Sequence, residues 1–272
     1  PYHPYRSAVE RLFLSSHLTH VDADEEDRHA APENLQVISD VNLPYTEHAR
    51  RYLLAEGVCK QHIYVTGSPM KEVINAHQEE IDKSDVLSRL GLEKKKYIIL
   101  SAHREENIDI LQNFEKLVNS INQLAETYNI PVIYSMHPRS EKYIKERNVI
   151  FHNFVRPMPP FCFTEYSALM KNAFCVVSDS GTMPEEAAIG HFPAVCIRTS
   201  TERPEALDKG DFVIGGIGEN EVLQAVDMVT KMAGAGDFGA KVPDYEVDNV
   251  SSVVVRVIQS YTKIINETVW RK

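Results

Sequence analysis

From about residue 60 onward, short runs of β-branched and aromatic residues alternate with longer stretches of helical periodicity. Such alternation is typical of βαβ units, in which helices connect the strands of a parallel sheet. Several runs, such as YIIL at 97–100, are apolar throughout, as expected of strands that are covered on both faces. The sequence therefore predicts an α/β fold with a parallel sheet.

The apolar runs and the periodic stretches give approximate element boundaries. Strands are expected at residues 63–66, 97–101, 132–136, 149–151, 174–178, 194–198 and 212–214. Amphipathic helices are expected at 110–128, 164–172, 219–232 and 249–270. Residues 1–37 show neither pattern and are partly acidic and rich in alanine, so we expect at most local helix there.

The composition excludes several functional classes. A formal net charge of −10 argues against binding to nucleic acid or to an anionic membrane. No apolar stretch approaches the roughly 20 residues of a membrane span, and no signal-peptide pattern is present, so a cytoplasmic location is expected. Cys162, Cys175 and Cys196 lie in apolar runs without metal-ligand spacing. They are expected to be buried thiols in a reducing compartment, and no metal site is expected.

A tight turn, Ser180-Gly181-Thr182, follows the predicted strand at 174–178. It precedes a short helix expected at 185–189, with Pro184 suited to its first turn. The N–H groups of such a turn and the positive end of the helix can hold a phosphate. Glu186, one turn into the helix, can accept hydrogen bonds from two ribose hydroxyls. The same residues also fit an ordinary strand–turn–helix connection with a capping Ser or Asp.

Polar clusters follow three other predicted strands. His103, Arg104 and Glu105 follow the strand at 97–101 and form a candidate acid–base and phosphate-binding group, although a solvated charged loop is the alternative. His137 follows the strand at 132–136. The cluster after the strand at 194–198 contains Arg198, Glu202 and Arg203. Because the carboxyl ends of parallel strands share one edge of the sheet, the sequence predicts a single site there.

Three of these segments together resemble the non-hydrolysing UDP-N-acetylglucosamine 2-epimerases: SAHREEN at 101–107, SDSGTMPEEA at 178–187 and RTSTERPEAL at 198–207. Further segments resemble the enzymes of capsule and O-antigen synthesis that form UDP-N-acetyl-L-fucosamine. They are ISDVNLPYTEHARRYL at 38–53, VTGSPM at 65–70 and the final stretch at 248–272. The resemblance extends from about residue 38 to residue 272.

The resemblance implies a GT-B-like fold, with two Rossmann-like domains and the ligand between them. Residues 69–248 are then the C-terminal UDP-binding domain, and 249–272 form a helix that crosses back to the N-terminal part. Residues 1–68 are expected to be a remnant of the N-terminal domain, with 1–37 unmatched to the family. Glu25, Glu26 and Glu33 are possible counterparts of a family acid.

The resemblance also assigns roles to residues of the strand-end clusters. It implies that His103, Arg104 and Glu105 are catalytic, and that His137 matches a histidine that contacts a regulatory UDP-sugar in some relatives. Thr182 stands where the family has glycine. The residues implied to bind UDP are Ser180, Gly181, Thr182, Glu186, Arg198, Glu202 and Arg203.

The chemistry of the family needs no cofactor. UDP is eliminated across C1–C2 to give a 2-acetamidoglycal, and re-addition places the proton on the other face of C2. The substrate is expected to be UDP-GlcNAc, UDP-ManNAc or a UDP-N-acetyl-6-deoxyhexosamine, and a homo-oligomer, such as a dimer, is expected. Two alternatives remain open, namely a UDP-sugar-binding module with weak or no catalysis and a GT-B glycosyltransferase.

Overall fold

The computed structural model describes residues 39–271. The chain divides into two compact units. The larger unit comprises Val73–Val242, and the smaller one takes its described residues from Pro1–Glu72 and Pro243–Lys272. Glu25, Glu26 and Glu33 lie outside the described residues, as does the whole of the segment 1–37.

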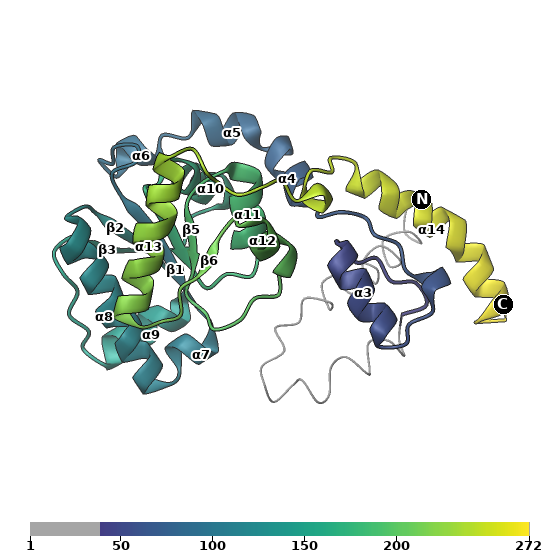
Figure 1. The fold of residues 1–272 in the computed structure, drawn as a ribbon, viewed down its shortest axis with the longest axis horizontal. Coiled ribbons are helices and arrows are strands. Elements are labelled where there is room, and N and C mark those ends of the chain that lie inside the picture. Colours follow the sequence, from purple (N-terminus) through teal and green to yellow (C-terminus); the bar gives the residue numbers. More distant parts are fainter. Residues whose placement is uncertain (1–38, 272) are drawn as a thin grey trace. The chain divides into compact units, whose positions relative to one another are not determined.

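The larger unit is built on a six-stranded sheet in the order β3-β2-β1-β4-β5-β6 (Figure 1). Every neighbouring pair of strands is parallel. The strands are β1 (Ile98–Ala102), β2 (Val132–Met136), β3 (Val155–Met158), β4 (Cys175–Ser178), β5 (Ala194–Cys196) and β6 (Val213–Ile214). The predicted α/β fold with a parallel sheet is therefore confirmed.

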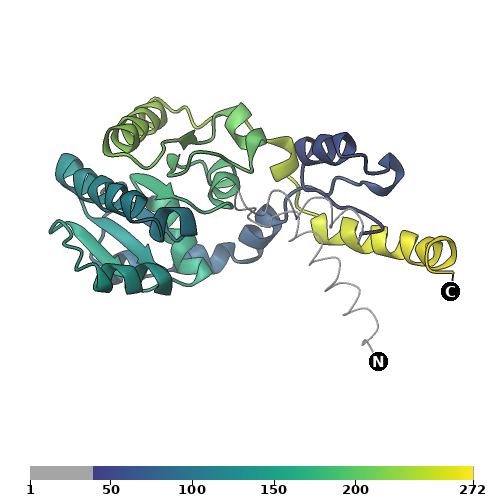
Figure 2. The same cartoon turned by 90° about the horizontal axis from the view of Figure 1, so that it is seen from below.

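Helices precede, connect and follow the strands of this sheet, with α5 and α6 before β1 and α13 after β6. They are α5 (Gln78–Lys83), α6 (Val86–Arg89), α7 (Glu105–Ile108), α8 (Leu111–Tyr128), α9 (Pro138–Glu146), α10 (Phe163–Asn172), α11 (Met183–Gly190), α12 (Pro204–Lys209) and α13 (Glu219–Gly234). Figures 1 and 2 show α8 and α13 on the same face of the sheet. Tyr97, just before β1, donates to the carbonyl of Leu169 in α10 at 2.6 Å, which places α10 against the opposite face.

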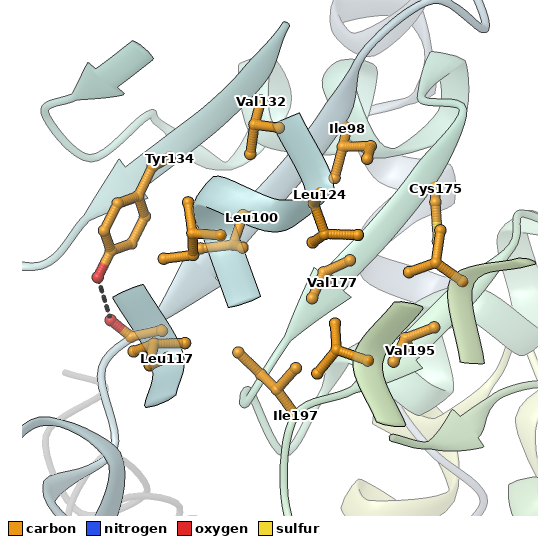
Figure 3. Close-up of a cluster of buried hydrophobic side chains, with 14 of the residues drawn as sticks. Ile98, Leu100, Leu117, Leu124, Val132, Tyr134, Cys175, Val177, Val195 and Ile197 are labelled. Carbon is orange, nitrogen blue, oxygen red and sulfur yellow. Dashed lines mark hydrogen bonds between the residues drawn. The ribbon is translucent and has the colours of Figure 1, made fainter. Parts of the chain in front are cut away.

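Alternate strand residues build the main core beneath α8 and α13 (Figure 3). Leu100 of β1, Val177 of β4 and Leu117 of α8 are among the buried side chains that meet there. The intervening residues Ile99 and Val176 are buried as well. Both faces of the central strands are therefore covered, which explains why these strands are apolar throughout rather than alternating.

Strand β3 shows where the sequence-based boundaries were wrong. A strand was expected at 149–151, but the observed strand is Val155–Met158. Val149 instead donates its N–H to the carbonyl of Ile144 at the end of α9. Because β3 lies at the edge of the sheet and pairs only with β2, it tolerates Pro157, which has no N–H to donate.

The smaller unit contains α3 (Glu47–Ala55), the 3-10 turns Lys60–His62 and Pro243–Tyr245, and α14 (Val250–Thr268); α4 (Met70–Ala76) spans the boundary between the units. The strand expected at 63–66 is reduced to a parallel bridge between Asn42 and Ile63. In the smaller unit no residue of α3 is buried, and in α14 only Val250 and Ile265 are buried.

Two expectations about the surface and the interior can be compared with the structure. None of the helices in residues 39–271 is long and apolar enough to cross a membrane. Cys175 and Cys196 are buried, as expected, but Cys162 is exposed because it lies at the N-terminal cap of α10, at the start of the helix.

Candidate functional site

The candidate site lies at the carboxyl ends of β1 and β4, where the strand order reverses. From β1 the sheet extends to β2 and β3 on one side and to β4, β5 and β6 on the other. Ser101 and Ser178 are paired at the ends of the two strands, and Asp179 donates its N–H to the carbonyl of Ser101 at 3.2 Å. Open α/β sheets bind their ligands at this kind of switch point.

Asp179 lies at the centre of the site and is fully buried. Its carboxylate accepts the backbone N–H of His103 at 2.9 Å and that of Arg104 at 2.9 Å. Burial by itself would raise the pKa of Asp179, but a hydrogen bond from His103 and its charge, with hydrogen bonds from the Arg104 backbone and the Asn107 amide, bring the pKa below its usual value. Asp179 is therefore an ionised carboxylate that holds the loop after β1.

The imidazole of His103 also contacts this carboxylate. Its Nδ1 lies 3.0 Å from Oδ1 of Asp179, and the His103 side chain is 42% exposed. A ring that is held at Nδ1 presents Nε2 on its opposite edge. The arrangement therefore resembles that of an acid–base histidine, which is oriented by a buried carboxylate.

Asn107 connects this loop to the neighbouring strand. Its side-chain amide is buried and donates to Oδ2 of Asp179 at 3.0 Å and to the carbonyl of Ile197 at 3.1 Å. Ile197 directly follows β5, so one amide joins the segments after β1, β4 and β5. These contacts keep the three strand ends together.

The turn after β4 leads directly into α11. Ser178 Oγ accepts the N–H of Ser180 at 3.1 Å, and Ser180 Oγ lies 3.1 Å from Thr182 Oγ1. Thr182 is the N-cap of α11 and has a φ of −89°. The backbone at this position is therefore one that any residue adopts, so a threonine where relatives were expected to have glycine causes no strain.

Arg104 extends over the turn and brings the clusters together. Its Nε donates to the carbonyl of Asp179 at 2.9 Å. One of its terminal nitrogens would lie 3.5 Å from a Cβ added to Gly181, and the same nitrogen is 3.7 Å from a carboxylate oxygen of Glu202. The guanidinium, the glycine turn and the segment after β5 therefore share one small region.

Glu202 binds a second arginine in the same region. Both of its carboxylate oxygens accept hydrogen bonds from Arg198, each at 2.5 Å. Burial opposes ionisation of Glu202, but the hydrogen bonds and charge of Arg198, with the charge of Arg104, lower its pKa. Glu106 also lies 3.8 Å from Arg198, so two arginines and two carboxylates share this region, and the guanidinium groups supply the donors that suit an anionic group.

Arg203 has a different environment. Its side chain and that of Glu185 are both buried, and Arg203 Nε lies 2.5 Å from a carboxylate oxygen of Glu185. The pair joins the start of α12 to the first turn of α11. Removing one partner would leave a buried charge, so this pair positions the helices that border the site.

Glu186 lies in the first turn of α11, beside Glu185. Burial and the negative charge of Glu185 raise the pKa of Glu186 to about 7, and a hydrogen bond from Thr182 opposes this shift. Tyr166 of α10 lies near enough for the charge of Glu186 to contribute to the raised pKa of its hydroxyl, after burial itself. Near neutral pH, Glu186 is therefore only partly ionised.

Glu105 and His137 lie at the outer side of the site. Glu105 forms an ion pair with Arg139, which also binds Asp109 at 2.9 Å. His137 caps α9, where its Nδ1 accepts the N–H of Arg139 at 3.3 Å, and its side chain is exposed. The rings of His137 and His103 have centroids 6.2 Å apart. The segments after β1 and β2 thus meet, as the strand-end pattern predicted.

The structure assigns central positions to two residues that the sequence analysis gave no role. Asp179 and Asn107 were read only as parts of their motifs. A polar residue directly after an apolar strand, as Asp179 is after CVVS, was the available signal. The burial of Asp179 and its contacts with the loop after β1 depend on the pairing of β1 with β4. No local sequence pattern reveals that pairing.

Comparison with known proteins identifies the family. The sequence profile described as UDP-N-acetylglucosamine 2-epimerase matches residues 18–259. The UDP-N-acetylglucosamine 2-epimerase of Methanococcus maripaludis is 29% identical over 201 residues, which cover 71% of this chain and 55% of that protein. The corresponding protein of Methanocaldococcus jannaschii is 28% identical over 229 residues, covering 79% of this chain and 63% of that protein.

Solved structures lead to the same family. The chain resembles the UDP-N-acetylglucosamine 2-epimerase of Rickettsia bellii with a TM-score of 0.81 and 38% identity, over 92% of this chain and 67% of that one. It also resembles the Methanocaldococcus jannaschii enzyme in complex with UDP-GlcNAc and UDP, with a TM-score of 0.77 and 26% identity, over 85% of this chain and 64% of that one. The expected fold class, a GT-B-like α/β fold with a Rossmann-type sheet, is confirmed.

The extent of these matches and the site geometry agree. The chain spans 55% and 63% of the lengths of the two curated relatives. The three motifs that carried the resemblance meet around Asp179 and Gly181 in the structure. With the family profile matching most of its length, the chain belongs to the UDP-N-acetylglucosamine 2-epimerase family.

Proposed function

We propose that this chain binds the UDP part of a UDP-sugar at the carboxyl ends of β1 and β4 and takes part in epimerisation of the sugar at C2. The observation that carries the proposal is the position of Arg104 over the Gly181 turn, with Glu202 and Arg198 beside it. This places a guanidinium group beside the turn that leads into the N-terminal end of α11. Both favour a diphosphate.

Each predicted ligand contact has a physical basis in this geometry. The diphosphate is proposed to lie against Ser180, Gly181 and Thr182, where the N-terminal end of α11 adds its positive dipole. Arg104 and Arg198 supply charge, and Glu202 holds Arg198 in place. Arg203 is proposed to support this wall through Glu185.

Glu186 is proposed to accept hydrogen bonds from the ribose hydroxyls. A carboxylate can accept both hydroxyls of a ribose, whereas a protonated carboxyl group accepts them less well. Because the pKa of Glu186 is raised to about 7, UDP affinity should increase as the pH rises through neutrality. Ionisation of Glu186 therefore couples nucleoside binding to pH.

The proposed reaction is elimination and re-addition of UDP. UDP leaves C1 with its bonding electrons as a proton leaves C2, which gives a 2-acetamidoglycal. In the return step an acid protonates C2 of the glycal on the opposite face, and UDP forms its bond to C1 again. His103, held by Asp179, is proposed to act in proton transfer or to assist the departing UDP, with Arg104 and Glu105 completing its motif.

The finer assignments extend this proposal. We propose UDP-GlcNAc and UDP-ManNAc as substrates, with a UDP-N-acetyl-6-deoxy-L-hexosamine converted to UDP-N-acetyl-L-fucosamine as the more specific possibility. The setting is then the supply of surface-polysaccharide precursors, capsule or O-antigen, in the cytoplasm. A homo-oligomer, such as a dimer, and a regulatory contact at His137 belong to the same proposal.

Binding without turnover is the second candidate function, and one observation favours it. Epimerisation needs a base on one face of C2 and an acid on the other. In the described part of the site, Glu105 and Glu202 are both ion-paired with arginines. Apart from His103, the site offers Glu186, which is proposed to bind the ribose and is the only described carboxyl group there whose pKa is raised to about 7.

Exchange of the C2 proton for deuterium separates the candidates. The full chain is incubated in D2O with UDP-GlcNAc or with a UDP-N-acetyl-6-deoxyhexosamine, and deuterium at C2 is followed by NMR. Exchange supports the epimerase. UDP binding without exchange supports the binding module, and a requirement for a sugar acceptor would indicate a glycosyltransferase.

The ribose contact has its own test. UDP at a hundred times its Kd should stabilise the folded chain by about 2.7 kcal/mol. Glu186→Ala should weaken UDP more than pyrophosphate, since only UDP carries ribose. Glu141→Ala, on the exposed surface of α9, is the matched control and should change neither affinity. Equal losses for both ligands in Glu186→Ala would contradict the ribose assignment.

A further inference from the structure

We propose that Asp179 is a positioning residue that acts through His103: its buried carboxylate holds the imidazole with Nδ1 protonated and so leaves Nε2 as the atom that exchanges a proton with the ligand. The inference rests on the proposed function insofar as it assigns His103 to proton transfer. Its structural part, the fixed tautomer of His103, stands on the contacts of Asp179 alone.

The two carboxylate oxygens of Asp179 have different neighbours. Oδ2 accepts from the backbone N–H of His103 at 2.9 Å, from that of Arg104 at 2.9 Å and from the amide of Asn107 at 3.0 Å. Oδ1 lies 3.0 Å from Nδ1 of His103 and 3.1 Å from the His103 N–H. One oxygen thus mainly fixes the loop, and the other contacts the ring.

The contact at Oδ1 determines the tautomer of the ring. An ionised carboxylate only accepts hydrogen bonds, so the Nδ1 that faces it must carry a proton. The neutral ring then has its lone pair on Nε2, and the protonated ring is stabilised by the negative charge of Asp179. A histidine held in this way is prepared to take a proton at Nε2 and to return it.

Asn107 keeps the carboxylate in its orientation. Its amide binds Oδ2 and is itself anchored on the carbonyl of Ile197, which follows β5. Rotation of the carboxylate would break this hydrogen bond as well as those to the backbone. Asn107 therefore secures the orientation that places Oδ1 against the ring of His103.

Support of the loop alone is the competing explanation, and it predicts a different coupling. If Asp179 only holds the backbone of residues 103 and 104, its loss should weaken UDP binding and turnover together, whether or not His103 is present. If it acts through the ring, its loss should matter little once His103 has been removed. A double-mutant cycle separates these cases.

The informative substitution is Asp179→Asn. Several donors converge at the Oδ2 position, so the new amide oxygen is expected there, and the amide NH2 should face Nδ1 of His103. The ring must then accept at Nδ1, which reverses its tautomer. We expect the C2 exchange rate to fall by about 10²–10⁴-fold, as for loss of acid–base catalysis, while the Kd for UDP changes by less than about tenfold.

The cycle uses four full-length chains: the parent, Asp179→Asn, His103→Ala and the double variant. In the His103→Ala background, Asp179→Asn should lower the exchange rate by less than about threefold. The acid limb of the parent pH–rate profile should also move to lower pH in Asp179→Asn, because the charge that favours the imidazolium is lost. Additive losses with an unmoved pH profile would overturn the proposal.

The tautomer is measured independently of activity. In chains labelled with 15N-histidine, the signals of His103 are identified by their loss in His103→Ala. The parent should show a proton on Nδ1 and an unprotonated Nε2 in the neutral form, and Asp179→Asn should show the reverse. A parent ring protonated at Nε2 would overturn the proposal. If the parent shows no C2 exchange, the proposed function fails, and this measurement still decides the role of Asp179.

If Asp179→Asn does not fold, a less disruptive variant with its own control tests the same proposal. Asn107→Ala removes the hydrogen bonds to Oδ2 and to the carbonyl of Ile197, and the lost contact with Oδ2 should lower the exchange rate by about 5–10-fold. Asn113→Ala is the matched control, because Asn113 donates to the carbonyl of Glu106, the neighbour of Asn107 in α7, and no hydrogen bond joins it to Asp179. Equal effects of the two variants would show that loop support alone is involved and would overturn the proposal.

Discussion

In the α/β unit, the strands at the centre of the sheet are almost wholly buried, whereas α3 of the smaller unit has no buried residue and α14 has only Val250 and Ile265. The smaller unit buries a few apolar side chains, among them Leu43, Ile63 and Tyr245, and adds polar contacts between distant segments. Lys71 binds Glu246 at 3.0 Å, and Trp270 Nε1 donates to Asp40 at 3.0 Å. A continuous apolar core stabilises the larger unit, whereas the smaller unit combines a few buried apolar side chains with hydrogen bonds between distant segments.

This difference explains where the site residues can be held rigidly. Asp179, Asn107 and Arg203 all lie at the ends of strands or helices whose interior is packed. A buried carboxylate keeps its orientation only if its surroundings cannot rearrange, and a packed sheet supplies that rigidity. We therefore expect changes in the two units to have different consequences.

The largest expected contrast is between two histidines. His103→Ala should lower any C2 exchange or epimerisation by about 10²–10⁴-fold with little loss of UDP affinity. His62→Ala, in the smaller unit, should leave the rate close to that of the parent because its ring packs on Tyr261 outside the sheet. Rates are measured by deuterium exchange at C2. Near-parent turnover in His103→Ala would reduce this residue to a structural role.

The next contrast concerns stability. Leu100→Ala removes a side chain that is 1% exposed in the core and should cost about 2–5 kcal/mol. Ile264→Ala removes one that is 47% exposed on α14 and should change stability by about 0.5 kcal/mol or less. Denaturant unfolding with probes in each unit measures both changes. Comparable losses would show that Ile264 is covered in solution by a surface that the described residues do not include.

A pH-dependent contrast comes from Asp211. This residue lies just before β6, at the amino end of that strand, whereas the candidate site lies at the carboxyl ends of the strands. Burial raises the pKa of Asp211 to about 7, and its buried Oδ2 has no hydrogen-bond partner among the described residues. The folded chain thus binds this proton more tightly than the unfolded chain, so the contribution of Asp211 to stability falls as the pH rises from about 4 through 7.

Asp211→Asn should remove this dependence. Relative to the parent, the variant should gain about 1–3 kcal/mol of stability between pH 5 and pH 8.5, with UDP affinity unchanged. Thermal unfolding across this pH range gives the comparison. A constant difference between variant and parent at all pH values would show that Asp211 is ionised throughout and that its partner lies elsewhere.

The smallest expected effect is in the smaller unit. Tyr261 and Tyr64 share a hydrogen bond through their hydroxyls, and Tyr261 also donates to the carbonyl of Gln61 at 3.0 Å. Tyr261→Phe should cost about 0.5–1.5 kcal/mol. Hydrogen exchange should show faster opening of α14 and no change in β1 or β4. Faster exchange in the sheet as well would mean that the two units unfold together.

Several features of the fold were predictable from local patterns. Five of the expected strands and all four of the long expected helices are present, because the 3.6-residue period and the apolar runs reflect burial of helix and strand faces. The strand at 155–158 was missed because an edge position permits Arg156 and Pro157, which do not resemble a buried strand. The strand expected at 63–66 forms only an isolated parallel bridge, between Ile63 and Asn42.

The sequence alone established that polar clusters follow the strands and meet at one edge of the sheet, since all parallel strands end on the same side. It also carried the family resemblance through three motifs. Only the tertiary structure revealed how the clusters divide their roles. Arg203 is bound to Glu185 in the interior, Glu105 is bound to Arg139, and Asp179 is enclosed by donors from residues 103, 104 and 107. The physical reason is that a charged side chain acquires its role from its burial and its partners, and both depend on which strands pair.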